Sequence, residues 1–230
     1  MEDKAGMSNI TEMVESLDSR APVVGINIVG TSVAGEPHEF PLKLNMGAGL
    51  QKYEGYIGID IDPDMPACDM EHDLMEPLDL PDECASHIFC SHTLEHLPGW
   101  RAEYTLKDWR RLLQPNGILW GHVPDCEVYA EKFLETMNGD EWGHRKATEA
   151  LLGGYAWDHT VTETQAHHMA YTKETLERAL NRAGFTIIKV EKENPGRHDW
   201  RLTFFALKGE NPPAKMAEPT WGPMEEGVAE

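Results

Sequence analysis

The sequence predicts a single α/β domain with a doubly wound, mostly parallel sheet that closes with an antiparallel strand. Apolar segments of strand composition alternate with segments of helical periodicity through most of the chain. Two β-rich segments, Phe185–Val190 and Leu202–Leu207, then follow each other directly and predict a closing antiparallel pair. Glycines and acids follow the early strands, where ligands bind in sheets of this kind. The 230 residues suffice for one such domain with terminal extensions.

The first two strands enclose a glycine turn and end in acids. Leu42–Met46 is an apolar strand, Gly47-Ala48-Gly49 follows it, and Tyr56–Ile61 forms the second strand. Glycines at this position let a ligand approach the backbone, and Asp60 at the tip of the second strand can accept from both hydroxyls of a ribose. The alternative is a tight turn followed by a solvated acidic tip. We expect a nucleoside-containing cofactor here.

The later elements are marked by caps and chain breakers. Asp125 is a candidate N-cap, Thr172 is another, and Gly184 ends the last helix. The expected elements are a short strand within Asp69–Leu80, a strand at His87–Ser91, a helix at Pro98–Leu113, a strand at Ile118–Val123, a helix at Val128–Met137 and a helix after Thr172.

The domain is expected to span residues 41–208, with an arm before it, a tail after it and an insertion within it. Residues 1–40 carry an amphipathic helix (Ile10, Met13, Val14, Leu17) and an edge strand or hairpin arm (Val23–Val29), and this arm offers a surface for a homo-oligomer. Residues 138–168 are rich in His, Trp and Gly without clear periodicity, which is typical of a substrate lid or binding loop. Residues 209–230 contain four prolines and end acidic, so we expect disorder.

Composition restricts the partners. The net charge is −20, from 20 Lys and Arg against 40 Asp and Glu, which disfavours binding to nucleic acid. The four cysteines show no Cys-x-x-Cys spacing, as expected of thiols in a reducing compartment. The N-terminus lacks the apolar segment of a signal peptide, and no apolar run has the length of a membrane span. We therefore expect a cytoplasmic protein with no membrane partner and a small-molecule substrate.

The glycine turn does not fit a dinucleotide. Gly47-x-Gly49 lacks the third glycine of the dinucleotide fingerprint, and the segment Gly47–Gly55 is too short for the helix that holds a pyrophosphate. A parallel crossover normally needs about a dozen residues or more, so this short connection is also in tension with the predicted sheet. The site remains adequate for a cofactor without phosphate, such as S-adenosylmethionine.

An ordered set of motifs resembles the class I S-adenosylmethionine-dependent methyltransferases, which have a Rossmann-like fold. The chain is similar in particular to a compact subgroup with the motifs LNLGCG and NID. The matching segments are Leu44–Gly49, Gly55, Gly58-Ile59-Asp60, His72-Asp73-Leu74, Ser91–Leu97, Leu106–Gly117, Val123-Pro124-Asp125 and Tyr171–Phe185. Two departures are Ala48, where the family usually has Cys, and Asn45, where many members carry an acid.

The resemblance implies a set of cofactor contacts. Gly47 and Gly49 would pass close to the methionine and sugar parts, and Asp60 would hold the ribose. Asp73 and the Leu74 amide would lie at the adenine edge, while Ser91 and His92 would border the methionine moiety and the methyl group. The full set of expected cofactor-binding residues is Asn45, Met46, Gly47, Ala48, Gly49, Asp60, Ile61, Asp73, Leu74, Ser91 and His92.

The histidines suggest the acid–base chemistry. His92 is the first candidate for a general base, because imidazole titrates near neutrality, and Asp125 and His122 are the next candidates. His92-x-x-Glu95-His96 also matches a zinc-peptidase pattern, which requires both histidines on one helical face. Pro98-Gly99 interrupts such a helix, so we expect no metal and assign Glu95 and His96 to orienting loops or substrate.

These observations predict methyl transfer from S-adenosylmethionine to a small-molecule or saccharide-type acceptor. The reaction is an in-line displacement, in which the protein aligns the reactants and a histidine can accept a proton. Two alternatives remain. One is a non-catalytic subunit that keeps the fold for binding or scaffolding, and the other is a zinc hydrolase built on His92–His96.

Overall fold

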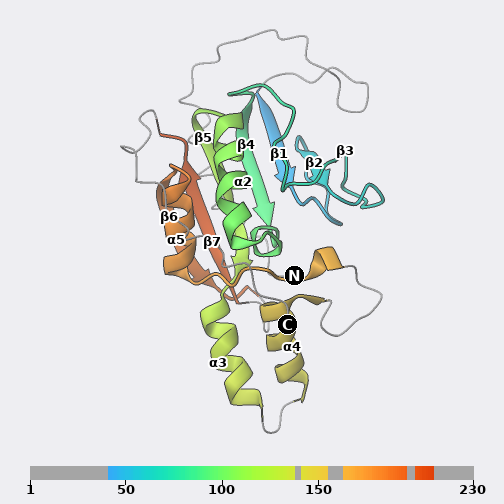
Figure 1. The fold of residues 1–230 in the computed structure, drawn as a ribbon, viewed down its shortest axis with the longest axis vertical. Coiled ribbons are helices and arrows are strands. Elements are labelled where there is room, and N and C mark those ends of the chain that lie inside the picture. Colours follow the sequence, from blue (N-terminus) through green and yellow to red (C-terminus); the bar gives the residue numbers. More distant parts are fainter. Residues whose placement is uncertain (1–40, 138–140, 155–162, 196–199, 210–230) are drawn as a thin grey trace, which may run out of the picture.

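The structure is a computed structural model that describes residues 41–137, 141–154, 163–195 and 200–209 (Figure 1). The expected N-terminal helix, the strand at 23–29 and nearly all of the acidic tail lie outside these ranges. The elements are β1 (Leu42–Met46), β2 (Ile57–Asp60), β3 (Met70–Glu71), β4 (Ala85–Ser91), α2 (Gly99–Leu112), β5 (Leu113–Pro124), α3 (Cys126–Thr136), α4 (Glu141–Leu152), α5 (Lys173–Arg182), β6 (Thr186–Glu193) and β7 (Arg201–Leu207), with 3-10 turns at Leu94–His96 and Glu163–Gln165.

The strands form one seven-stranded sheet in the order β3-β2-β1-β4-β5-β7-β6. The pairs from β3 to β5 are parallel, whereas β7 is antiparallel to both β5 and β6. The predicted fold class and the closing antiparallel pair are therefore confirmed. From β1 the strand order runs in one direction to β2 and β3 and in the other direction to β4 and β5. The topological switch point therefore lies between β1 and β4, and sheets of this kind bind ligands at the carboxyl ends of the strands at that point.

Helices cover the sheet and extend its carboxyl edge. α2 and α5 lie on one face of the sheet, and α3 and α4 extend beyond the carboxyl ends of the parallel strands, at the bottom of Figure 1. The α2 side chains Leu106 and Trp109 are fully buried in the core between the helices and the sheet. These side chains lie on the face of the helix that packs against the core.

The connection between β1 and β2 crosses over without a helix, as the sequence predicted. The rings of Tyr53 and Tyr56 instead pack edge-on against Phe89 of β4, with Tyr53 and Phe89 centroids 5.1 Å apart. Phe89 in turn packs on Trp120 of β5, at 4.2 Å. Aromatic packing therefore anchors the short connection to the sheet where a helix would normally do so, and this resolves the tension with the parallel pairing.

The expectation of an irregular segment over 138–168 was wrong for α4. This helix packs against α3, and its buried residues are Gly143, Ala147 and Thr148. These side chains are small, so the buried face carries too little hydrophobicity to produce a recognisable helical period. The use of this region for substrate binding stays a prediction.

Gly121 lies where β5 passes closest to β4. A Cβ atom at this position would overlap the carbonyl oxygen of Cys90, which belongs to the sheet backbone and cannot move aside. We expect Gly121→Ala to lower the free energy of unfolding by about 3 kcal/mol or more, as overpacking in a rigid core does. Urea denaturation measures the change.

Gly99→Ala provides the control, because the nearest atom to its Cβ is the flexible Met169 Sδ at 3.1 Å. Its effect should stay within about 1 kcal/mol, the scale of helix propensity. Equal unfolding midpoints for the wild type and Gly121→Ala would contradict the close approach of the two strands.

Candidate active site at the carboxyl edge of the sheet

The glycine turn after β1 adopts a backbone that only glycine takes easily. Gly47 has φ +68° and Gly49 has φ +56°, in the left-handed region. A Cβ at Gly47 would also overlap the Thr93 hydroxyl. Thr93 is buried and its hydroxyl donates to the Met46 carbonyl at 2.9 Å. The turn is therefore locked against the segment that follows β4.

Asp60 ties the end of β2 to this turn. Its Oδ2 accepts from the Gly49 amide at 2.8 Å, and its Oδ1 accepts from the Asp62 amide at 3.1 Å. The residue is half-buried. Two amide donors fix the orientation of the carboxylate, while each oxygen keeps a further lone pair for a ligand.

The other expected cofactor residues follow neighbouring strands. Asp73 Oδ1 accepts from the Met75 amide at 2.9 Å, and the Leu74 carbonyl accepts from the Thr105 hydroxyl at 3.0 Å. Asn45, Met46 and Ala48 are buried around the end of β1, whereas Ile61 is 44% exposed. Ser91 ends β4. The sheet order brings these residues to one edge, and their contact with cofactor stays a prediction.

His92 follows directly and has a strained backbone. Its φ of +53° is rare for a residue with a side chain, and its amide donates to the His122 carbonyl at 2.9 Å. The side chain is 44% exposed, and Nδ1 lies 3.3 Å from Oε1 of the buried Glu95. This distance allows an ion pair, although its geometry is not that of a hydrogen bond. Strain of this kind often marks functional sites.

The other two catalytic candidates have different surroundings. His122 Nδ1 lies 3.0 Å from the Thr203 hydroxyl, which donates to Glu193, so the ring carries its proton on Nδ1. Burial, with smaller contributions from Arg201 and His92, lowers the pKa of His122 to about 3. Asp125 is buried, and its Oδ2 lies 3.4 Å from Lys192 Nζ.

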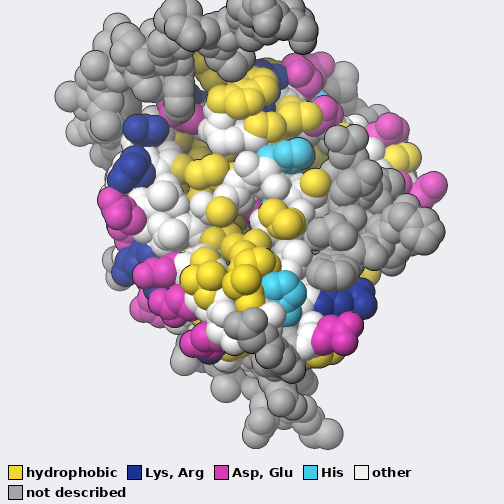
Figure 2. Space-filling model, turned by 60° about the horizontal axis from the view of Figure 1, so that its bottom comes forward, with side chains coloured by type: hydrophobic (Ala, Val, Ile, Leu, Met, Phe, Trp, Pro, Cys, Tyr) yellow, Lys and Arg dark blue, Asp and Glu magenta, His cyan; other side chains and the backbone are white. Residues whose placement is uncertain are grey.

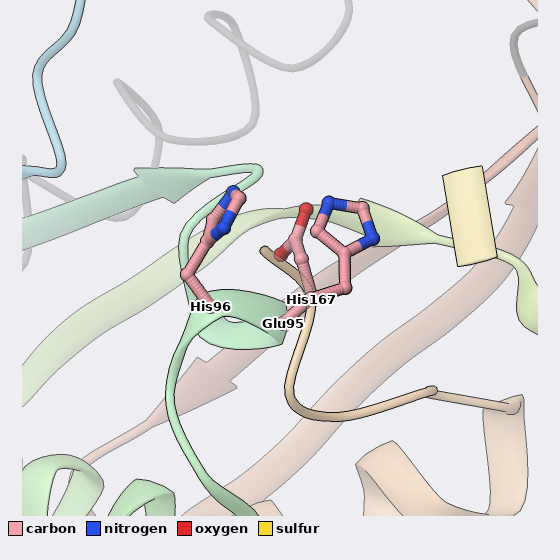
Figure 3. Close-up of side chains that lie close together, drawn as sticks. All are labelled: Glu95, His96 and His167. Carbon is pink, nitrogen blue, oxygen red and sulfur yellow. The ribbon is translucent and has the colours of Figure 1, made fainter. Parts of the chain in front are cut away.

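A second group of side chains converges beside His92. One ligand atom from each of Glu95, His96 and His167 lies within 4.8 Å of the others (Figure 3). His167 belongs to the segment after the 3-10 turn at 163–165, and that segment is joined to Glu95 through its carbonyl, which accepts from the amides of His168 and Met169. Burial is the main cause that lowers the pKa of His167.

Sequence reasoning singled out Glu95 and His96 but missed their convergence with His167. The zinc-peptidase pattern places His92 and His96 on a helix, yet Leu94–His96 is only a 3-10 turn. Of the two adjacent histidines, His167 faces Glu95 and His168 is exposed. No local pattern signals a pairing between segments so far apart.

Figure 2 shows the molecule turned so that this end comes forward. Apolar side chains gather in the middle of the face with histidines among them, and most acidic and basic side chains lie toward the rim.

Comparison with known proteins identifies the family. A family model described as a methyltransferase domain matches residues 44–190. The chain belongs to this family. It is a class I S-adenosylmethionine-dependent methyltransferase, with a fold in which the expected cofactor residues lie at the ends of β1, β2, β3 and β4. A search of curated proteins found no match.

Solved structures share the fold at low sequence identity. An S-adenosylmethionine-dependent methyltransferase from Methanosarcina mazei is 17% identical, with a TM-score of 0.52, over 72% of this chain and 91% of that one. The 1,6-didemethyltoxoflavin-N1-methyltransferase of Burkholderia thailandensis, solved with bound 1,6-didemethyltoxoflavin and S-adenosylhomocysteine, is 14% identical, with a TM-score of 0.51, over 90% of this chain and 80% of that one. Within the described ranges, no helix combines the length and hydrophobicity that a bilayer span needs.

The low pKa of His122 predicts a pH-dependent stability. The folded state keeps this ring neutral down to about pH 3, whereas the unfolded chain binds a proton below about pH 6.5. Stability is therefore lost as the pH falls through this window. A His122→Gln variant has no group that titrates at this position. Between pH 7 and pH 5, the free energy of unfolding of the wild type should therefore fall by up to about 2 kcal/mol more than that of the variant. Urea denaturation at both pH values checks this, and an equal fall in both proteins would contradict it.

Proposed function

We propose that this methyltransferase methylates a small-molecule or saccharide-type acceptor at the carboxyl edge of its sheet. The observation that carries the placement is the fixed Asp60 carboxylate beside the Gly47–Gly49 turn. The net charge of −20 supports an acceptor that is not a polyanion. The four cysteines, which are all free thiols, support a cytoplasmic location.

The residues present fit S-adenosylmethionine. The oriented oxygens of Asp60 can accept from both ribose hydroxyls, and the glycine turn leaves room for the sugar and methionine parts. Ile61, the residue after this acid, has an exposed apolar side chain. The face of adenine would cover that side chain. Asp73, oriented by the Met75 amide, would meet the adenine edge. No helix follows the turn in 47–56, which disfavours a pyrophosphate in its place.

The cofactor supplies an activated methyl group on a sulfonium centre. The protein must then align the acceptor, exclude water and, for a hydroxyl acceptor, remove a proton. His92 is the best placed to do so, because it follows the strand end at Ser91, is partly exposed and has Glu95 beside Nδ1. The Glu95 carboxylate, 3.3 Å from Nδ1, would offset the positive charge that the ring gains when it takes the proton.

The other candidates suit different roles. A pKa of about 3 makes His122 a poor base but leaves a neutral Nε2 that can accept a hydrogen bond from a substrate. Asp125 stands at the N-cap of α3, but its side chain makes no capping hydrogen bond, and its charged neighbour is Lys192. An ion pair with this lysine would hold Asp125 ionised and oriented, which suits positioning of a substrate better than proton transfer. The N-terminal arm remains our proposal for a homo-oligomer contact.

Loss of the Asp60 carboxylate should weaken cofactor binding. We expect Asp60→Ala to reduce the affinity for S-adenosylmethionine by about 1–3 kcal/mol, the scale of charge-assisted hydrogen bonds to the ribose. Isothermal titration calorimetry measures the change. Because Asp60 also holds two amides, thermal unfolding must show that the variant is folded.

Asp64→Ala is a matched control, since Asp64 is an exposed acid near the same strand end. Its affinity should equal that of the wild type. An unchanged affinity in folded Asp60→Ala would remove Asp60 from the cofactor site.

The acceptor class is tested with a methyl-labelled cofactor. The full chain is incubated with a cell extract separated into metabolite, protein and nucleic-acid fractions, and the label is followed by mass spectrometry. We expect label in the metabolite fraction. Label confined to protein or nucleic acid would overturn the proposed acceptor, and no label in any fraction would favour a scaffold role.

A further inference from the structure

The Glu95, His96 and His167 side chains share an arrangement that their roles in methyl transfer do not explain. The rings of the two histidines are 4.8 Å apart between centroids and inclined at 77°. Glu95 is fully buried between them, while both histidines are partly buried (Figure 3). One potential ligand atom from each residue lies within 4.8 Å of the other two.

Both imidazoles are held by backbone carbonyls. His96 Nδ1 lies 3.1 Å from the Ala166 carbonyl oxygen, and His167 Nδ1 lies 2.9 Å from that of Ala150. A carbonyl only accepts, so both rings carry their proton on Nδ1 and keep a lone pair on Nε2. Histidines that bind metal ions are oriented in this way by their second nitrogen.

The Glu95 carboxylate is buried and receives no hydrogen bond from the described residues. Neither oxygen makes a hydrogen bond within the described residues, although His92 Nδ1 is 3.3 Å from Oε1. A buried carboxylate without hydrogen bonds is costly, and a bound cation would offset that cost. This observation is independent of the histidine geometry and points to the same ligand.

We propose that Glu95, His96 and His167 bind one divalent transition metal ion. Ligands about 2.1 Å from an ion are at most about 4.2 Å apart, so atoms within 4.8 Å need only small side-chain rotations to close around it. Two imidazole nitrogens with one carboxylate favour Zn²⁺ or a neighbouring transition metal over Mg²⁺ and Ca²⁺, which prefer oxygen ligands alone.

Three protein ligands leave coordination positions open. An oxygen of the methyl acceptor could occupy one, since Glu95 lies beside His92, which we place next to the transferring methyl group. This consequence rests on the proposed function, whereas the metal site itself does not.

The test uses full-length protein without a histidine tag, freed of metal by a chelator and dialysed. Calorimetric titration with Zn²⁺ should show one site per chain, and Mg²⁺ should show none. Glu95→Gln, His96→Gln and His167→Gln should each weaken Zn²⁺ binding at least tenfold. His168→Gln is the matched control, because His168 is adjacent but exposed, and it should bind as the wild type does.

Titration of the wild type with Co²⁺ keeps the test decisive if variants fail to fold. The visible spectrum should show ligation by nitrogen and oxygen without a sulfur charge-transfer band. Absence of binding, binding of Mg²⁺ alone, equal affinity in folded His167→Gln, or a sulfur band from the cysteines would overturn the proposal. None of these readouts requires methyl transfer, so failure of the proposed function would be distinguishable.

Discussion

The hydrogen bond from the Gly49 amide to the Asp60 carboxylate is the constraint on which the cofactor half of the site depends. It joins the ends of β1 and β2 at 2.8 Å, across a connection that contains no helix. Packing of Tyr53 against Phe89 holds the middle of this connection, and the Thr93 hydroxyl fixes its beginning through Met46. An acid and a glycine turn are thus held side by side before any ligand arrives, which reduces the cost of ordering the site on binding.

The carboxyl edge divides into two chemically different halves. The ends of β1, β2 and β3 offer backbone, glycines and accessible acids, which suit the ribose and adenine of a nucleoside. The segment after β4 places His92 and His96 beside the buried Glu95, and β5 carries His122, so this half suits an acceptor and its proton. His92 lies where the halves meet. The backbone strain at this residue is consistent with a side chain held for function.

The sequence predicted the sheet well because its strands are strongly apolar and its breakers are clear. His87–Ser91 and the helix after Pro98 needed no tertiary information, and the ends of successive strands could be assigned to one edge from the parallel order alone. α4 was missed because Gly143 and Ala147 form a buried face without large apolar side chains. The position of His167 beside Glu95 was missed because contacts between remote segments decide it, and no local spacing reports them.

Calorimetric titration of the full chain with S-adenosylhomocysteine, in parallel with NAD, tests the central claim most directly. The helix-free turn after β1 and the fixed Asp60 carboxylate predict one S-adenosylhomocysteine site per chain and no measurable binding of NAD. Binding of NAD without binding of S-adenosylhomocysteine would contradict the assignment of this edge to a methyltransferase cofactor.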